Sequence, residues 1–315
     1  MIINIILLVL GFIILIKGAD IFVDGSSSLA LNFKLSKMLI GLTIVSFGTS
    51  APEFAVSVTS LLSGNGDIVI GNVVGSNILN ILLILGVSSM IHHLEVKNNT
   101  VKKEIPITIL ITTLLFVLLS DNIFDNNVVN SLTREDGIVI LLFFTVFIYY
   151  LISMMRNKID EDIEIKYGIL KSVIFIILGI SAIVLGSNLV VNNSTELAKI
   201  MGISDRIISL TIVALGTSLP ELVTSVVATK KKEYDIAIGN VVGSNIFNIG
   251  IVLGLPIALF GGINNISFEI LDLIVMLVSA LLLFVFAFKD RKINKKEGII
   301  FLIIFVIYYG YIIIK

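Results

Sequence analysis

Two acidic residues lie in apolar segments, where a charged side chain costs free energy. Glu53 and Glu221 fall inside long apolar segments, whereas most other Asp and Glu residues fall near polar or charged stretches. A charge at the centre of a bilayer costs at least about 2.5–3.5 kcal/mol on insertion scales. No basic residue is expected at that depth, so the pair predicts a site for a cationic ligand. Protonated glutamates that only hydrogen-bond between helices are the alternative.

Each glutamate ends a short motif that can expose further oxygen atoms. The motifs are GTSAPE at 48–53 and GTSLPE at 216–221. Pro52 and Pro220 lack a backbone N–H, and their rings clash with the carbonyl four residues earlier, so both motifs favour local unwinding of a helix. Unwound backbone at membrane depth is tolerated where it lines a cavity. Without the glutamates, such a motif could be only a kink. The candidate ligands are the carbonyls of Ser46, Thr49, Ala214 and Thr217 and the hydroxyls of Thr49, Ser50, Thr217 and Ser218.

A second motif, also present twice, offers neutral oxygens. It reads GNVVGSNILN at 71–80 and GNVVGSNIFN at 239–248. Its serine and its last asparagine are four residues apart and therefore share a helical face. Its glycines, also four apart, favour close helix packing. The candidate ligands are Ser76, Asn80, Ser244 and Asn248. For the remaining asparagines, Asn72, Asn77, Asn240 and Asn245, interhelical hydrogen bonds are favoured over direct ligation.

The number and type of these oxygens suit a hard cation. Ca²⁺ takes six to eight oxygens from carboxylates, carbonyls, amides and water, whereas Mg²⁺ dehydrates reluctantly and is less suited to a site built of protein oxygens. Two glutamates, two asparagines and four carbonyls meet the count for Ca²⁺, but the same oxygens could be divided among several Na⁺ ions. One divalent or two monovalent cations neutralise two carboxylates, and this competition would be the physical basis of exchange.

The composition indicates which elements position these residues. Of 315 residues, 57% are hydrophobic and 14% are charged, against about 25% charged in soluble domains. Apolar runs of about 20 residues predict an all-α polytopic membrane protein with ten transmembrane helices. The expected spans are 2–22, 38–62, 67–92, 105–121, 136–155, 170–192, 206–229, 235–261, 270–288 and 297–314.

The chain contains an internal repeat. A shift of 168 residues superposes both motifs without a gap, with nine identities in ten for the second motif. The sequence therefore predicts two five-helix repeats, one in residues 1–158 with a connecting loop and one in residues 159–315. Because five is odd, the second repeat enters the membrane from the opposite side. Inverted repeats are found in many secondary transporters, with the substrate site at the repeat interface.

Basic residues predict the orientation and narrow the function. Of the 22 Lys and Arg residues, 17 fall in the odd-numbered loops, so the positive-inside rule places both termini outside. The net charge of −1 argues against nucleic-acid binding through bulk basicity. There is no cysteine and there are two histidines, which excludes thiolate sites and argues against a multi-histidine zinc site. The carboxylates come without a nucleophile–base set or a cofactor motif, so an enzyme is not expected.

On the paired motifs, the sequence resembles the cation/calcium exchanger superfamily, specifically prokaryotic Na⁺/Ca²⁺ exchangers. The resemblance covers nearly the whole chain. It implies a central Ca²⁺ site at Glu53 and Glu221, helped by the carbonyls of Thr49 and Thr217, and a first and a sixth helix that slide to switch access. It also implies two flanking Na⁺ sites. One would use the Ser46 carbonyl, Thr49, Ser50, Glu53 and Ser244, and the other the Ala214 carbonyl, Thr217, Ser218, Glu221 and Ser76.

One position departs from the resemblance. Well-known exchangers of this kind carry Asp at the second asparagine position, whereas here both Asn80 and Asn248 are amides. The centre therefore holds two carboxylates rather than three, which leaves the stoichiometry and the coupling ion open. The leading expectation is a Na⁺/Ca²⁺ antiporter of a prokaryotic plasma membrane, electrogenic if three Na⁺ exchange for one Ca²⁺. It would need no cofactor and no obligatory protein partner. A Ca²⁺/H⁺ antiporter that uses the same glutamates, and a passive cation channel, are the alternatives.

Overall fold

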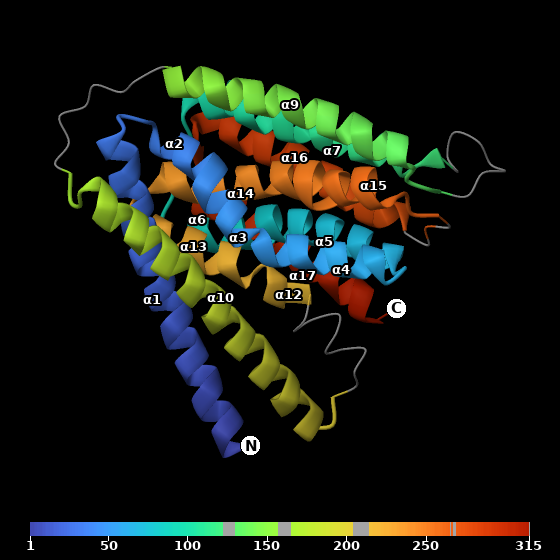
Figure 1. Ribbon diagram of the computed structural model, residues 1–315, viewed down its shortest axis with the longest axis horizontal. Helices are drawn as coiled ribbons and strands as arrows, with labels where there is room; N and C mark the ends of the chain where they lie inside the picture. The colour runs from blue at the N-terminus through green and yellow to red at the C-terminus, as the bar shows by residue number, and fades with distance from the viewer. Residues whose placement is uncertain (122–129, 157–164, 204–213, 265, 267–268, 315) are drawn as a thin grey trace.

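The chain folds into a bundle of helices, shown as a computed structural model in Figure 1. The structure describes residues 1–121, 130–156, 165–203, 214–264, 266 and 269–314. Within these residues, seven helices are long and apolar enough to cross a membrane, or eight if the bent segment Lys37–Leu62 is one span. The described secondary structure is helical apart from one antiparallel pair of two-residue strands, β1 (Leu94–Glu95) and β2 (Lys292–Ile293).

Two long helices, α1 (Ile2–Asn32) and α10 (Ile169–Ile200), pack against each other and lean away from the other helices (Figure 1). They are antiparallel and very close, because glycines lie at their contacts. A Cβ on Gly186 would lie 2.6 Å from the backbone nitrogen of Leu15. A Cβ on Gly179 would lie 2.8 Å from the Cα of Phe22. Side chains larger than hydrogen are excluded at these two positions by backbone atoms.

The centre of the bundle contains two sets of short helices whose bounds repeat at the offset of the sequence repeat. Each element of the first set corresponds to one of the second with every bound shifted by 168 residues. The first set is α3 (Ser46–Thr49), α4 (Ala51–Leu62), α5 (Gly66–Leu79) and the π-helical turn η2 (Asn80–Leu85), and the second is α12 (Ala214–Thr217), α13 (Leu219–Lys230), α14 (Tyr234–Phe247) and η5 (Asn248–Leu253). The internal repeat of the sequence is thus also a repeat of local structure.

Further elements flank the two sets. Before the first set come α2 (Lys37–Ile40) and the π-helical turn η1 (Gly41–Val45), and after the sets come α6 (Gly86–Ile91) and α15 (Gly254–Phe260). Gly41 of η1 meets Gly239 of α14, where a Cβ on Gly239 would lie 3.0 Å from the Cα of Gly41. The predicted packing role of the second-motif glycines is confirmed for Gly239. The glycines of the first copy would pack on the segment of the second repeat that corresponds to η1. That segment falls in residues 204–213, outside the described residues.

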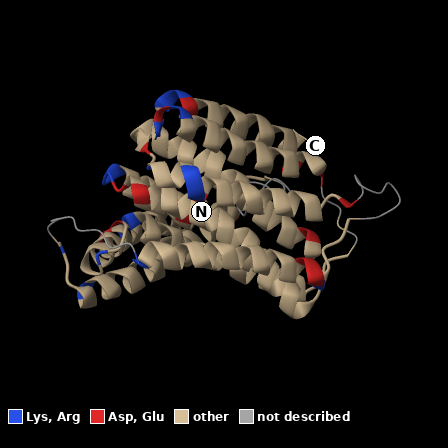
Figure 2. Cartoon of the chain, turned by 90° about the horizontal axis from the view of Figure 1, so that it is seen from above, with Lys and Arg blue, Asp and Glu red and all other residues tan. Residues whose placement is uncertain are grey.

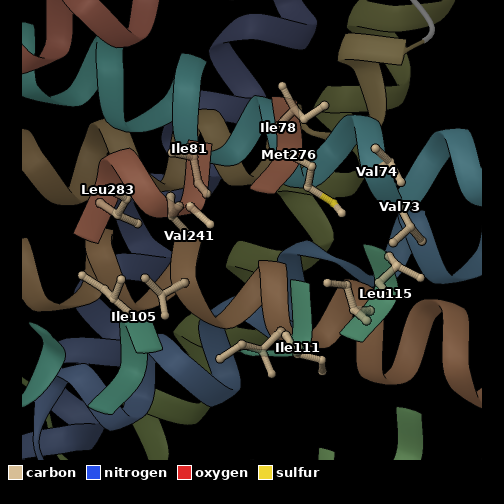
Figure 3. Packing of buried hydrophobic residues seen from close by; sticks show 14 of the residues in the cluster. Val73, Val74, Ile78, Ile81, Ile105, Ile111, Leu115, Val241, Met276 and Leu283 are labelled. Atoms are coloured by element: carbon tan, nitrogen blue, oxygen red, sulfur yellow. The ribbon is translucent and has the colours of Figure 1, made fainter. Parts of the chain in front are cut away.

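The remaining elements form an outer layer around the centre. It consists of η3 (Thr100–Glu104), α7 (Ile105–Leu118), α9 (Arg134–Arg156), α16 (Ile270–Asp290) and α17 (Lys295–Ile314). Ile105, Ile111 and Leu115 of this layer pack with Met276 and with α5 and α14 residues in one buried apolar cluster (Figure 3). Apolar side chains of this cluster pack around α5 and α14 and thereby fix the positions of the polar residues on these two helices.

The two ends of the bundle differ in charge. Lys and Arg gather mainly at one end, and the middle of the helices is almost free of charge (Figure 2). At that end the β1–β2 pair connects the third and ninth predicted loops. An ion pair of 2.8 Å between Lys37 and Glu233 connects the first and seventh predicted loops. At the other end the backbones of Leu132 and Ile263 pair as an isolated antiparallel β-bridge, which connects the fourth and eighth predicted loops. Odd-numbered loops thus meet odd-numbered loops and even-numbered loops meet even-numbered ones.

Each of the ten expected spans contains helix among its described residues, although only seven, or eight with the bent segment, are long and apolar enough to cross a membrane. The bounds differ clearly in two cases. The first and sixth were expected to end at 22 and 192, but α1 and α10 continue to Asn32 and Ile200. In the extension of α1, Gly25 packs on Ser172 and Phe175 at the start of α10. Because α1 is longer than expected, Asp20 and Asp24 lie within a helix rather than at its end. Both contact Lys231, with N···O distances of 2.8 and 2.6 Å. The N-terminal part of the seventh expected span, residues 206–213, lies outside the described residues.

Candidate ion-binding site

Both glutamates lie in the first turn of a helix that begins at a break. The first break is at Ser50, between α3 and α4, and the chain bends there by 46°. The second is at the matching Ser218, between α12 and α13. Each break precedes a proline, whose missing N–H leaves the carbonyl four residues earlier without its helical donor. Carboxylates in a first turn are favoured by the helix dipole, which supplies part of their stabilisation.

The two glutamates are linked across the repeats by the serines at the breaks. The hydroxyl of Ser50 donates to Oε1 of Glu221 at 3.0 Å, and the hydroxyl of Ser218 donates to Oε1 of Glu53 at 3.4 Å. Glu53 is 0% exposed and Glu221 is 1% exposed. Within the described ranges, neither carboxylate makes a salt bridge. The broken-helix halves of the two repeats therefore meet with two buried carboxylates between them.

Four buried oxygens of this centre have no hydrogen-bond partner among the described residues. They are Oε2 of Glu53, Oε2 of Glu221, Oδ1 of Asn80 and Oδ1 of Asn248. The four come in two pairs related by the 168-residue offset. A buried polar group without a partner costs about 1–3 kcal/mol, and more when it is charged. Carboxylate and amide oxygens are ligand types that a hard cation such as Ca²⁺ takes, and these four would supply part of the six to eight that Ca²⁺ needs.

The remaining candidates surround these four oxygens. Ser218 also donates to the hydroxyl of Ser76 at 3.2 Å, and Ser244 donates to the carbonyl of Ser46 at 3.5 Å. Thr49 is buried at the end of α3. The second-copy counterparts, Thr217 and Ala214, end and begin α12, and the structure does not describe the side chain of Ala214. These candidates come from α3, α5, α12 and α14 and from the two breaks, and Ser50 and Ser218 donate directly to the glutamates.

In each repeat, one asparagine joins the helix that carries the glutamate to the helix that follows it. The amide of Asn72 donates to the carbonyl of Glu53 at 3.1 Å and to Ser57 at 3.0 Å. In the second copy, Asn240 donates to the carbonyl of Glu221 at 3.3 Å and to Ser225 at 2.9 Å. The predicted interhelical role of Asn72 and Asn240 is confirmed. Sequence reasoning did not single out Ser57 and Ser225, although their identity at equivalent repeat positions is a signal that could have found them.

The sequence also missed a contact between the site and the α1–α10 pair. Ser187 of α10 donates to the carbonyl of Gly216 at 3.1 Å, in the second copy of the glutamate motif. Among the described residues no group of three or more His, Cys, Asp or Glu side chains could hold a metal. The candidate site combines two carboxylates with hydroxyl, amide and carbonyl oxygens, so it is poor in charge and rich in neutral oxygens.

Comparisons with known proteins place the chain in a family. The family described as "Sodium/calcium exchanger protein" matches residues 3–153 and 171–314. The chain belongs to the sodium/calcium exchanger family. It is 37% identical over 320 residues to the putative antiporter CaxA of Alkalimonas amylolytica, and the match covers 98% of each chain. It is 32% identical to the sodium/calcium exchanger MaX1 of Methanosarcina acetivorans, with 96% of this chain and 97% of that one covered.

A solved exchanger structure has the same fold. The sodium-calcium exchanger NCX_Mj superposes with a TM-score of 0.85 at 33% sequence identity, and the match covers 98% of both chains. The resemblance noted in the sequence is confirmed. The chain is therefore a multi-pass membrane protein of the cation/Ca²⁺ exchanger type, and this family is a family of transporters. Membership of an exchanger family also disfavours the passive-channel alternative.

Proposed function

We propose that the chain is a Na⁺/Ca²⁺ antiporter that binds its ions between the two repeats and works by alternating access. The observation that carries the proposal is the set of four unpartnered buried oxygens on Glu53, Glu221, Asn80 and Asn248. In this assignment the four oxygens bind Ca²⁺ together with the carbonyls of Thr49 and Thr217. One Ca²⁺ then neutralises the two carboxylates, as two Na⁺ would.

Two flanking groups are assigned to Na⁺. The assignment is supported by the Ser244 to Ser46 and the Ser218 to Ser76 contacts, each of which joins two members of one group. The glutamates bond across the groups, since Ser50 donates to Glu221 and Ser218 to Glu53. The first Na⁺ group consists of Ser46, Thr49, Ser50, Glu53 and Ser244, and the second of Ala214, Thr217, Ser218, Glu221 and Ser76. Because each group shares its glutamate with the Ca²⁺ site, Na⁺ and Ca²⁺ compete for the same charge.

The proposed topology has ten spans in two inverted repeats, 1–158 and 159–315, with both termini outside. It is supported by the parity of the loops that meet at each end of the bundle and by the lysine-rich composition of the odd-numbered end. We place the chain in a prokaryotic plasma membrane, as the prokaryotic sources of the relatives suggest.

Reconstitution decides between Na⁺ and H⁺ as the coupling ion. Proteoliposomes loaded with Na⁺ and diluted into Na⁺-free medium with labelled Ca²⁺ are expected to take up Ca²⁺ against its gradient. A pH gradient alone is expected to drive no uptake, because the hydroxyl and carbonyl groups suit Na⁺ better than protons. Uptake driven only by the pH gradient would establish the Ca²⁺/H⁺ alternative. Uptake that follows the Ca²⁺ gradient alone would establish a channel.

Sliding of α1 requires that the ion pairs at the lysine-rich end break. Lys231, at the end of α13, bridges Asp20 and Asp24 of α1, and Lys166 also pairs with Asp24, at 2.7 Å. Ser27 of α1 donates to Glu233 at 2.9 Å. These partly exposed pairs contribute about 0.2–1 kcal/mol each. The Lys231 and Ser27 contacts hold α1 against the core at this end, whereas Lys166 lies just before α10 and ties α1 to that helix.

Lys231→Gln is therefore expected to shift the protein towards a state in which this end opens. The chain has no cysteine, so Ser26→Cys on α1, buried here with 0% exposure, gives a single reporter. Its labelling rate with a polar maleimide is expected to rise at least about two-fold and at most about thirty-fold in the Lys231→Gln background, as two pairs of this size allow. Lys230→Gln removes the same charge from the neighbouring exposed residue and serves as the control. Equal labelling in the two backgrounds would contradict the role of Lys231.

A further inference from the structure

Two asparagines next to the site connect the repeats to each other. Asn77 lies near the end of α5 and Asn245 near the end of α14, each three residues before a candidate ligand. The amide of Asn77 donates to the backbone carbonyl of Asn245 at 3.3 Å, and the amide of Asn245 donates to the backbone carbonyl of Asn77 at 3.3 Å. Both side chains are about 1% exposed. This reciprocal pair fixes the rotation of both amides, because each NH₂ group has a backbone acceptor on the other repeat.

The fixed amides in turn orient the candidate ligands of the opposite copy. Asn248 donates its NH₂ group to Oδ1 of Asn77 at 3.1 Å, and Asn80 donates its NH₂ group to Oδ1 of Asn245 at 2.9 Å. An amide has one oxygen and one NH₂ group on opposite sides, so holding the NH₂ group decides where the oxygen lies. In both cases the oxygen so placed is one of the four unpartnered buried oxygens.

Orientation matters more for an amide than for a carboxylate. If Asn80 or Asn248 turned over, its NH₂ group would face the cation and repel it, and one ligand would be lost. An aspartate presents an oxygen in either orientation. A chain with asparagine at both positions thus needs a device that fixes the amides, and the acceptors on Asn77 and Asn245 are suited to NH₂ donors and not to a carboxylate.

We propose that Asn77 and Asn245 are positioning residues that fix the side-chain oxygens of Asn248 and Asn80, respectively, towards the transported cation. The proposal rests on the ion site proposed above and adds a crossed assignment, in which each asparagine acts on the ligand of the other repeat. Neither positioning residue contacts the ion. Outer-shell partners that orient metal ligands typically change metal affinity by 10–100-fold when they are replaced.

The test is a set of double-mutant cycles read out by equilibrium binding of labelled Ca²⁺ to the purified full-length chain in Na⁺-free buffer. Asn77→Leu removes the acceptor for Asn248 and is expected to weaken Ca²⁺ binding about 10-fold or more. In an Asn248→Asp background the same Asn77→Leu change is expected to weaken binding less than about two-fold, because the orientation of residue 248 no longer matters. In an Asn80→Asp background the loss is expected to remain about 10-fold. Asn245→Leu is expected to show the mirror image, suppressed by Asn80→Asp and not by Asn248→Asp.

The crossed pattern separates positioning from packing. If Asn77 acts only by packing α5 against α14, its replacement weakens binding equally in all backgrounds, and the proposal is overturned. It is also overturned if Asn77→Leu binds Ca²⁺ as the wild type does. Glu53→Gln is included to distinguish failure of this proposal from failure of the proposed ion site. If Glu53→Gln also binds Ca²⁺ as the wild type does, the ion site itself is wrong.

Because Asn77 is buried, its replacement by Leu can impair folding. Asn77→Ser is therefore measured alongside, since its short hydroxyl keeps the position polar but cannot reach the NH₂ group of Asn248. Thermal unfolding in ion-free buffer identifies folded variants. Both replacements of Asn77 could unfold the chain when residue 248 is Asn. In that case, we expect Asn248→Asp to restore both folded protein and Ca²⁺ binding, and we expect Asn80→Asp to restore neither. Failure to recover in either background overturns the proposal.

Discussion

Replacing Glu53 by Gln is expected to abolish Na⁺-driven Ca²⁺ uptake, and Glu221→Gln is expected to do the same. Each change leaves one carboxylate to neutralise a divalent ion and turns one of the four unpartnered oxygens into an amide. We expect the Ca²⁺ affinity to fall by more than about 100-fold, beyond the 10–100-fold typical of outer-shell partners. Uptake into Na⁺-loaded proteoliposomes measures transport, and binding of labelled Ca²⁺ measures affinity.

These variants are also expected to separate loss of binding from loss of folding. An unpaired charge buried in a membrane protein destabilises the ion-free state, so its removal is not expected to lower the thermal midpoint without ions. Saturating Ca²⁺, at about 100 times its dissociation constant, stabilises a binding-competent chain by about 2.7 kcal/mol. This shift is expected to be lost in Glu53→Gln and kept in Glu196→Gln, which neutralises an exposed glutamate of α10. Wild-type Ca²⁺ flux through Glu53→Gln would refute its role as a ligand.

Gly186→Leu is expected to have the largest effect on stability. A Cβ there would lie 2.6 Å from the backbone nitrogen of Leu15 and 2.8 Å from the carbonyl oxygen of Gly11, and backbone atoms cannot move aside as a side chain can. Overpacking of this kind costs about 1–3 kcal/mol or more. We expect a thermal midpoint lower by several degrees in detergent. Transport is also expected to fall, because α1 and α10 must keep their close contact if they slide as a pair.

A glycine in open space is the control for this change. Gly310 lies in α17, another membrane helix, and nothing described lies within 4 Å of a Cβ placed there. Gly310→Leu adds the same side chain and is expected to leave the midpoint within about 1 °C of the wild type, as for surface substitutions. If the two variants lose the same stability, close backbone packing is not what Gly186 provides.

Much of the fold was predictable because membrane helices and repeats leave direct traces in a sequence. Every expected span corresponds to helix where the structure describes it, and the breaks at Ser50 and Ser218 fall where the prolines predicted unwinding. The lengths of α1 and α10 were underestimated. Apolar runs report how much helix lies in hydrocarbon, whereas the extension of α1 beyond that length packs on a segment far away in the sequence, as Gly25 does on Ser172 and Phe175 of α10.

The sequence by itself determined which residues form the candidate site. Two glutamates without counter-charges, two asparagines at matching positions and a constant offset of 168 residues point to one duplicated cation site. These features are local, because residue type, helical spacing and repeat offset can each be read along the chain.

Only the tertiary structure decided how the two copies connect. Ser50 donates to Glu221 rather than to Glu53, and Asn248 donates to Asn77 of the other repeat. Lys231, which the sequence explains as a topology signal, also pairs with Asp20 and Asp24. No periodicity encodes which copy a side chain reaches or which way an amide is turned. The turn of the amides follows from the close approach of α5 and α14 at Asn77 and Asn245, and the reach of Ser50 to Glu221 follows from the meeting of the two helix breaks.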